Sequence, residues 1–232
     1  MTTEKEPHDR SAIATCGVQP KDVEGIINID NTPFIKDAMS PEAVAFREAQ
    51  KRDVYPHQEM FGEHCTIMEY IECPVEMAYD YVSNIYSLEE YAVTLRDFRH
   101  LGGGVYRGID YSGPAPIYMR IEAHPGPRTV DHLCAWDQGI DLWMRYYYRF
   151  IDAKLAMNKP GTVMLWTNFR HTYYSSDSPA PPYIDEARKR TDRPWVGAYW
   201  DIFYPAHKIE AQNLKKILEA RFRAYEASRP VR

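Results

Sequence analysis

The alternation of hydrophobic and polar residues changes period several times along the chain. Hydrophobic positions recur at every second residue over 63–72, which is typical of a strand, and the spacing becomes helical over 74–94. Turn residues then separate six further strand-like stretches, namely 96–101, 105–111, 117–123, 129–136, 142–153 and 162–171. An amphipathic helix follows over 205–227. The pattern predicts a strand, helices, six antiparallel strands and a long helix.

Two stretches lack this pattern. Residues 1–60 show little periodicity except for a helix expected over 40–52, where Ser40 can cap and Pro41 can take the first position. Residues 173–193 are polar and proline-rich, and an aromatic run extends to Tyr204. We expect an N-terminal extension over 1–60 and one domain over 61–230. The insertion at about 173–204 should form a lid or contact a second subunit in a homodimer.

Composition and charge narrow the classes of partner. The 232 residues are 44% hydrophobic, enough for one core, and the formal charge of −5 provides no basic field for nucleic acid. No apolar run approaches the roughly 18 residues of a membrane span, and residues 1–10 are charged, unlike a secretory signal. We therefore expect a cytoplasmic protein that neither binds nucleic acid nor spans a membrane.

The four cysteines, Cys16, Cys65, Cys73 and Cys134, are scattered along the sequence. On one extended strand Cys65 and Cys73 would lie about 26 Å apart, too far for a disulfide. We expect reduced and mostly buried thiols.

Two segments carry a resemblance to a known family. They are IMEYIECPVEMAYDYVSNIYSLEEY at 67–91 and HKIEAQNLKKILEARF at 207–222. They resemble the START/Bet v 1-like superfamily, also called the polyketide cyclase and lipid-transport superfamily, over about 63–227. The resemblance implies an α+β helix-grip fold, in which a curved seven-stranded antiparallel sheet grips the C-terminal helix around a cavity. Members bind hydrophobic ligands, and some cyclise, aromatise or dehydrate polyketides.

The glycines at 102–104 fall where Bet v 1-like proteins carry a glycine-rich loop, although a tight turn alone would favour the same residues. The extension over 1–60 and the insertion before the last helix depart from the family. We expect the cavity between the helix and the sheet to measure several hundred Å³, as ligand cavities typically do.

Strand parity predicts which side chains face such a cavity, because charged residues avoid the inner face. Arg145 and Arg149 mark the outer face of one strand, and Asn168 and Arg170 mark that of the last. The inward sets are then Leu142, Met144, Tyr146, Tyr148 and Phe150; Val130, His132, Cys134 and Trp136; Ile117, Met119 and Ile121; and Val163, Leu165, Thr167, Phe169 and His171. The inward face of the first strand stays undecided, because its more apolar face also carries Glu69.

Five of these side chains could do proton chemistry, since histidine, buried tyrosine and a buried carboxyl group can each donate or accept a proton or a hydrogen bond. The catalytic candidates are His132, His171, Tyr146, Tyr148 and Glu69. The substrate-binding candidates are Trp136, Met144, Thr167, Phe169, Met119 and, on the terminal helix, Leu214. A purely structural role remains the alternative for each histidine.

The 13% of aromatic residues, concentrated over 106–204, fill a core or line a pocket for a planar ligand. No metal motif is present, although His207 and Glu210 lie one helical turn apart. We expect Glu210 to lie on the solvated face or to offset the helix dipole near the N-terminus of the helix, and we expect no metal or cofactor. Two classes remain. One is an enzyme that cyclises, dehydrates or otherwise rearranges a hydrophobic, aromatic or polyketide-like intermediate, which the lid-length insertion favours. The other is a non-catalytic carrier or sensor of a hydrophobic small molecule.

Overall fold

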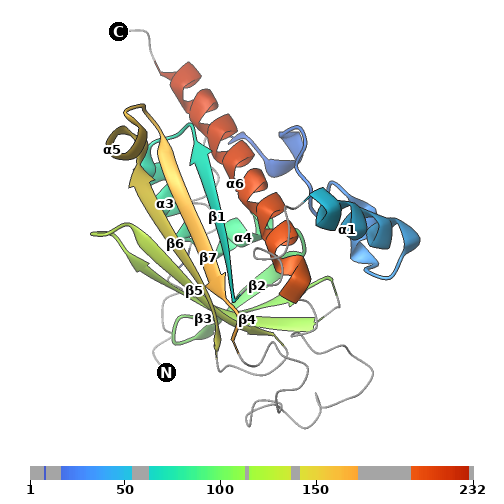
Figure 1. The fold of residues 1–232 in the computed structure, drawn as a ribbon. Coiled ribbons are helices and arrows are strands. Elements are labelled where there is room, and N and C mark those ends of the chain that lie inside the picture. The colour runs from blue at the N-terminus through green and yellow to red at the C-terminus, as the bar shows by residue number, and fades with distance from the viewer. Residues whose placement is uncertain are drawn as a thin grey trace.

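The computed structural model describes residues 8, 17–53, 63–112, 115–136, 142–171 and 200–229. Seven strands form one sheet in the order β1-β7-β6-β5-β4-β3-β2, and all neighbours are antiparallel. Their bounds are β1 His64–Ile71, β2 Leu95–Gly102, β3 Val105–Asp110, β4 Ala115–His124, β5 Thr129–Trp136, β6 Met144–Asp152 and β7 Thr162–Phe169. The long helix α6, Trp200–Ser228, runs across one face of the curved sheet (Figure 1).

Helix α6 buries its apolar stripe against the sheet. Leu214, Ile217 and Leu218 are fully buried, and α6 packs directly on β1. The predicted α+β helix-grip fold is therefore confirmed. The helix begins five residues before Pro205, although an internal proline costs about 3 kcal/mol. Burial of Trp200 and Phe203 in this first part of the helix offsets that cost.

The helices predicted over 74–94 form three separate segments. They are α3 Val75–Val82, the 3₁₀ turn η5 Ile85–Ser87 and α4 Leu88–Tyr91. The break lies at Asn84, whose backbone is extended and whose side chain accepts a hydrogen bond from the Tyr86 amide. Such a cap starts a new helical segment. Between β6 and β7 lies a further short helix, α5 Ala153–Met157.

The turn between β2 and β3 consists of Gly102, Gly103 and Gly104, with φ angles of 105°, 60° and 70°. These left-handed conformations favour glycine, so backbone geometry accounts for the glycine run.

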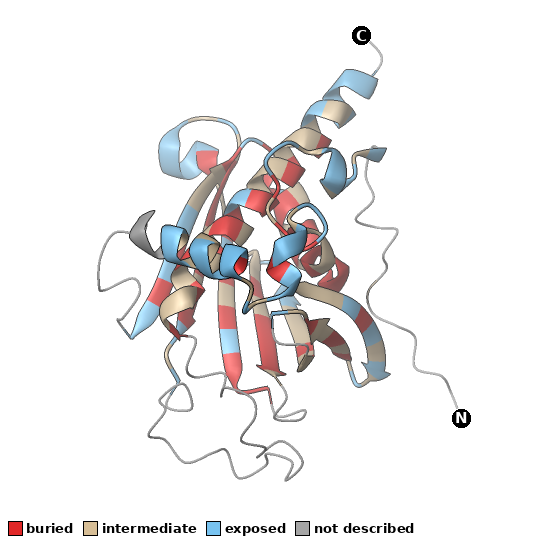
Figure 2. Ribbon diagram, turned by 90° about the vertical axis from the view of Figure 1, so that its right-hand side faces the viewer, coloured by how far each residue is buried: buried red, intermediate tan, exposed pale blue. Residues whose placement is uncertain are grey.

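The N-terminal segment packs closely on the domain. It comprises the 3₁₀ turns η3 Pro20–Asp22 and η4 Pro33–Lys36 and the helix α1 Pro41–Asp53, which confirms the helix expected over 40–52. The Ser40 hydroxyl accepts a hydrogen bond from the Ala43 amide at 3.1 Å, as a helix cap does. Ile26, Ile29 and Ile35 are buried. Figure 2 shows this segment in front of the sheet, with the exposed side of α1 outward.

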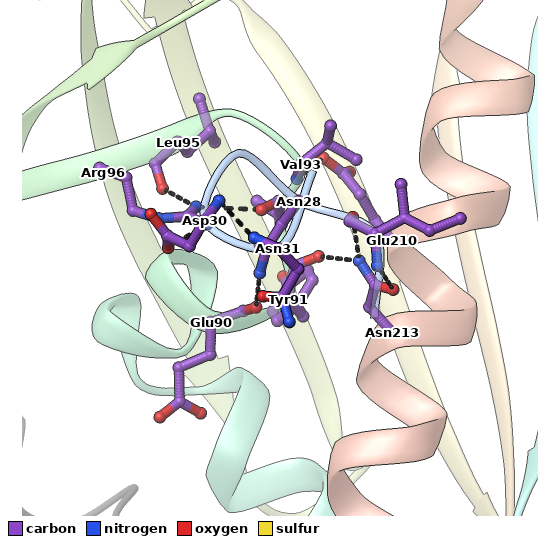
Figure 3. A network of polar contacts seen from close by, with 12 residues as sticks. Asn28, Asp30, Asn31, Glu90, Tyr91, Val93, Leu95, Arg96, Glu210 and Asn213 are labelled. Atoms are coloured by element: carbon purple, nitrogen blue, oxygen red, sulfur yellow. Dashed lines mark hydrogen bonds and ion pairs between the residues drawn. The ribbon is translucent and has the colours of Figure 1, made fainter. Parts of the chain in front are cut away.

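Asn213 attaches the N-terminal segment to the rest of the fold. Its side chain accepts a hydrogen bond from the Ile27 amide and donates to the carbonyl oxygens of Ile27 and Tyr91, at 2.8 and 3.0 Å (Figure 3). One fully buried amide thus joins α6, α4 and the chain at residue 27.

Cys65, Cys73 and Cys134 are buried thiols that form no disulfide, as expected, and Cys16 lies outside the described residues. Burial raises the pKa of Cys73 to about 12, so this thiol is not poised as a nucleophile. Within the described ranges, no helix is long and apolar enough to cross a membrane.

Candidate functional site

A cavity of about 220 Å³ lies between the sheet, α6 and the N-terminal segment. Its volume is somewhat smaller than the several hundred Å³ expected. The sheet contributes Met119, His132, Trp136, Tyr146, Tyr148 and Trp166. Helix α6 contributes Ile202, Phe203, His207, Ile209 and Glu210, and the N-terminal segment contributes Ile35, Met39, Ala43, Phe46, Arg47 and Gln50.

The N-terminal segment thus supplies a wall that we had not predicted. The predicted lid at 173–204 lies almost wholly outside the described residues, and its closing role stays a prediction. Its described end joins α6, where Phe203 is buried and lines the cavity.

The parity prediction is confirmed for β4, β5 and β6. His132 pairs with Tyr146, and Met119 pairs with Cys134, so their side chains share the inner face. His132, Tyr146, Tyr148, Trp136 and Met119 all belong to the cavity wall. Met144 and Leu214, which were expected to contact substrate, are buried in the core outside that wall.

The parity prediction is wrong for β7. Trp166 pairs in register with Tyr148, and their stacked rings lie 4.9 Å apart, so Trp166 faces inward. The inward set is Thr162, Met164, Trp166 and Asn168. Asn168, which was predicted to lie on the outer face of the strand, is buried.

The residues predicted to face inward at the end of β7 lie elsewhere. Phe169 and His171 are exposed, and the ring centroid of His171 lies 5.1 Å from that of Trp143. The Thr167 hydroxyl donates to the Cys65 carbonyl oxygen at 3.0 Å. All three lie outside the cavity wall.

Glu69 also lies outside the cavity wall. Its carboxyl group forms an ion pair of 2.6 Å with Lys208, which joins β1 to α6. This ion pair gives Glu69 a structural role, because it holds β1 and α6 together.

Glu210 is the acidic residue that the sequence reasoning misplaced. It is half-buried and lines the cavity, and its carboxyl oxygen accepts a hydrogen bond from the Val93 amide at 3.0 Å (Figure 3). Removal from bulk water and the nearby Asp110 charge together raise the pKa of Glu210 to about 8, against the opposing effect of the Val93 hydrogen bond. Glu210 therefore holds its proton at neutral pH.

A signal for this position was present in the helical spacing. Steps of three and four residues backward from the buried Ile217 and Leu214 lead to Glu210, His207 and Phe203. All three line the cavity.

His207 lies one turn before Glu210, enclosed by aromatic rings. Its ring centroid is 4.6 Å from that of Trp166, 5.3 Å from that of Tyr146 and 5.4 Å from that of Phe203. Burial lowers the pKa of His207 to about 3, so the imidazole is neutral. In the described part of the chain, its Nδ1 atom has no hydrogen-bond partner.

His132 is neutral in a defined tautomer. Its Nε2 atom lies 3.1 Å from the Val82 carbonyl oxygen, and because a carbonyl only accepts, Nε2 carries the hydrogen. Nδ1 therefore presents a lone pair. Burial lowers the pKa of His132 to about 4.

Two buried phenols add further polar groups beside the cavity. The hydroxyl oxygens of Tyr148 and Tyr91 lie 3.4 Å apart, and burial raises the pKa of both residues well above the usual value. Both stay neutral and can donate hydrogen bonds. Two indole N–H groups of the wall, Trp136 and Trp166, have no acceptor among the described residues.

No protein-family model and no curated protein sequence matches the chain. Among solved structures, the Zhui aromatase/cyclase from Streptomyces sp. R1128 matches 72% of this chain and 98% of its own length, at 11% identity and a TM-score of 0.48. A START superfamily protein from Mycobacterium smegmatis matches 70% of this chain and 98% of its own length, at 9% identity and a TM-score of 0.43. Likeness at this level carries no information on substrate or reaction.

The strand order, the gripped helix and the enclosed space identify a helix-grip protein with an internal cavity. Its wall is largely apolar and includes aromatic rings from the sheet, α1 and α6, together with a protonated carboxyl group and two neutral imidazoles.

Proposed function

We propose that this protein is an enzyme that encloses a hydrophobic, aromatic or polyketide-like molecule and catalyses its cyclisation or dehydration by proton transfer. The observation that carries the proposal is Glu210, a cavity carboxyl group with a pKa near 8. A proton donor is most effective when its pKa lies near the working pH.

For a β-hydroxy ketone, dehydration removes a proton from the α-carbon and expels the β-hydroxyl group. The Glu210 carboxyl group would protonate the departing hydroxyl, which leaves as water. A neutral imidazole, His207 through Nδ1 or His132 through Nδ1, would take the α-proton. The carboxylate and the imidazolium formed together stabilise each other, and transfer of the proton back restores both groups.

The phenols and rings would position the substrate. A neutral Tyr148 can donate a hydrogen bond to a ketone oxygen as negative charge develops there. Tyr146 and Trp166 offer flat surfaces to an aromatic ring. In this proposal His132, Tyr146 and Tyr148, which line the cavity, would act in catalysis or positioning. His171 and Glu69 lie outside the cavity wall and would have no such role.

The second candidate is a carrier or sensor that binds the same kind of molecule without changing it. The backbone contacts favour it, because His132 bonds the Val82 carbonyl and Glu210 bonds the Val93 amide, as structural polar residues do.

The experiment begins with solvent extraction of the purified protein and mass spectrometry of the small molecules that accompany it. The identified compound is then tested for binding and turnover with wild type, Glu210→Gln and, as a control, the exposed Glu226→Gln on the same helix. We expect Glu210→Gln to bind the compound and to lose about 10²- to 10⁴-fold in kcat. Binding without turnover by the wild type would establish the carrier.

A further inference from the structure

The inner side of α1 contributes a distinct chemistry to the cavity. Ala43, Phe46, Arg47 and Gln50 line the cavity, and their spacing places them on one side of the helix. Ala43 is buried and the other three are half-buried, whereas Val44 and Glu48 are exposed. Arg47 and Gln50 therefore lie on the cavity side of α1.

Arg47 is a cation with no counter-ion among the described residues. Within the described ranges, its side chain makes no hydrogen bond or ion pair, and neither does the side chain of Gln50. Two more deeply buried arginines are paired: Arg96 with Asp30 at 3.0 Å and Arg221 with Glu90 at 2.8 Å. A partly desolvated cation normally has such a partner.

The carboxyl groups of the cavity wall are engaged elsewhere. Asp110 accepts hydrogen bonds from the Thr94 hydroxyl at 2.7 Å and the Ser112 amide at 2.9 Å. The carboxyl group of Glu210, on α6, accepts a hydrogen bond from the Val93 amide. Neither forms an ion pair with Arg47.

We propose that Arg47 and Gln50 form an anion subsite where α1 borders the cavity, and that the ligand is an amphipathic carboxylate whose apolar body occupies the cavity. This inference rests on the proposed binding function. The planar guanidinium can hold a carboxylate through two parallel hydrogen bonds, and the Gln50 amide can donate a third. A singly charged carboxylate matches one arginine, whereas a doubly charged phosphate would leave charge unpaired.

Two probes of the same shape separate charge from packing: 2-naphthoate and its neutral analogue 2-naphthamide. Binding of each is measured by calorimetry with wild type, Arg47→Met, Arg47→Lys and the control Arg223→Met. Methionine keeps the length and helix propensity of the side chain, and Arg223 is exposed outside the cavity wall. Far-UV circular dichroism checks that each variant is folded.

We expect the wild type to prefer 2-naphthoate, and Arg47→Met to weaken naphthoate binding by about 10- to 100-fold, as loss of a charge-assisted contact does. Naphthamide binding should change less than about 3-fold by the same scale. Arg47→Lys should recover part of the loss, and Arg223→Met should bind both probes as the wild type does.

Equal loss of both probes in Arg47→Met, or no wild-type preference for the acid, would overturn the anion subsite while leaving the cavity as a binding site. If the wild type binds neither probe, the proposed binding function fails together with the subsite. The preference for 2-naphthoate is measured on the wild type. It can therefore refute the proposal even if a variant fails to fold.

Discussion

The Glu210 carboxyl group accepts a hydrogen bond from the Val93 amide at 3.0 Å, which joins α6 to the chain between α4 and β2. The same side chain lines the cavity. This contact fixes the orientation of the carboxyl group within the cavity wall.

The protonation of Glu210 predicts a pH dependence of stability. Because the folded pKa, about 8, exceeds the ordinary 4.5, the folded state binds the proton more tightly than the unfolded state. The contribution is present below about pH 4.5 and is lost as pH rises to about 8, with a slope of at most about 1.4 kcal/mol per pH unit. Urea unfolding of wild type and Glu210→Gln from pH 5 to 9 should show their stability difference falling with pH. A flat difference, like that expected for Glu226→Gln, would contradict the raised pKa.

His207 predicts the opposite trend in acid. Its folded pKa, about 3, lies below the ordinary 6.5, so the unfolded state binds the proton more readily. The contribution of the neutral His207 to stability is fully present above about pH 6.5 and is lost as the pH falls toward about 3. In urea unfolding at pH 7 and pH 5, His207→Phe should lose less stability than wild type between the two pH values. An equal loss in both proteins would indicate that His207 is not buried as a neutral ring.

The corrected face of β7 predicts a contrast between two aromatic residues. Trp166 is buried between the rings of Tyr148 and His207, so Trp166→Ala should lower the free energy of unfolding by about 3–5 kcal/mol. Phe169 is exposed, and Phe169→Ala should cost under about 1 kcal/mol. Denaturant unfolding of both variants measures the contrast. Equal costs would favour the opposite parity.

Asn213 predicts how firmly the N-terminal segment is held. Asn213→Ala removes hydrogen bonds to both backbone groups of Ile27 and to the Tyr91 carbonyl, and should cost about 1–3 kcal/mol or more. Limited trypsin digestion should then cut faster at Lys21 and Lys36. Arg223→Met, on the exposed side of α6, should leave the cleavage rate there unchanged. Unaltered cleavage in Asn213→Ala would mean that other contacts hold the segment.

Much of the fold could be predicted from periodicity. In β6, Arg145 and Arg149 are exposed while Met144, Tyr146 and Tyr148 are buried, because side chains alternate strictly and ionised groups avoid the interior. The long apolar stripe of α6 was similarly predictable, since a helix of that length must cover its hydrophobic side.

Tertiary structure alone decided the rest. In β7, apolar residues occupy both faces around Met164 and Trp166, so alternation could not select the inner face; the register with Tyr148 did. Glu210 is a residue type that is usually solvated. Only its burial in the assembled fold, together with the nearby Asp110 charge, raises its pKa, against the opposing effect of the Val93 hydrogen bond. Arg47 borders the cavity because contacts distant in sequence, such as Asn213 with Ile27, hold the N-terminal segment against α6. Local patterns record which face of an element is apolar, whereas the neighbours of a polar side chain depend on segments far away in the sequence.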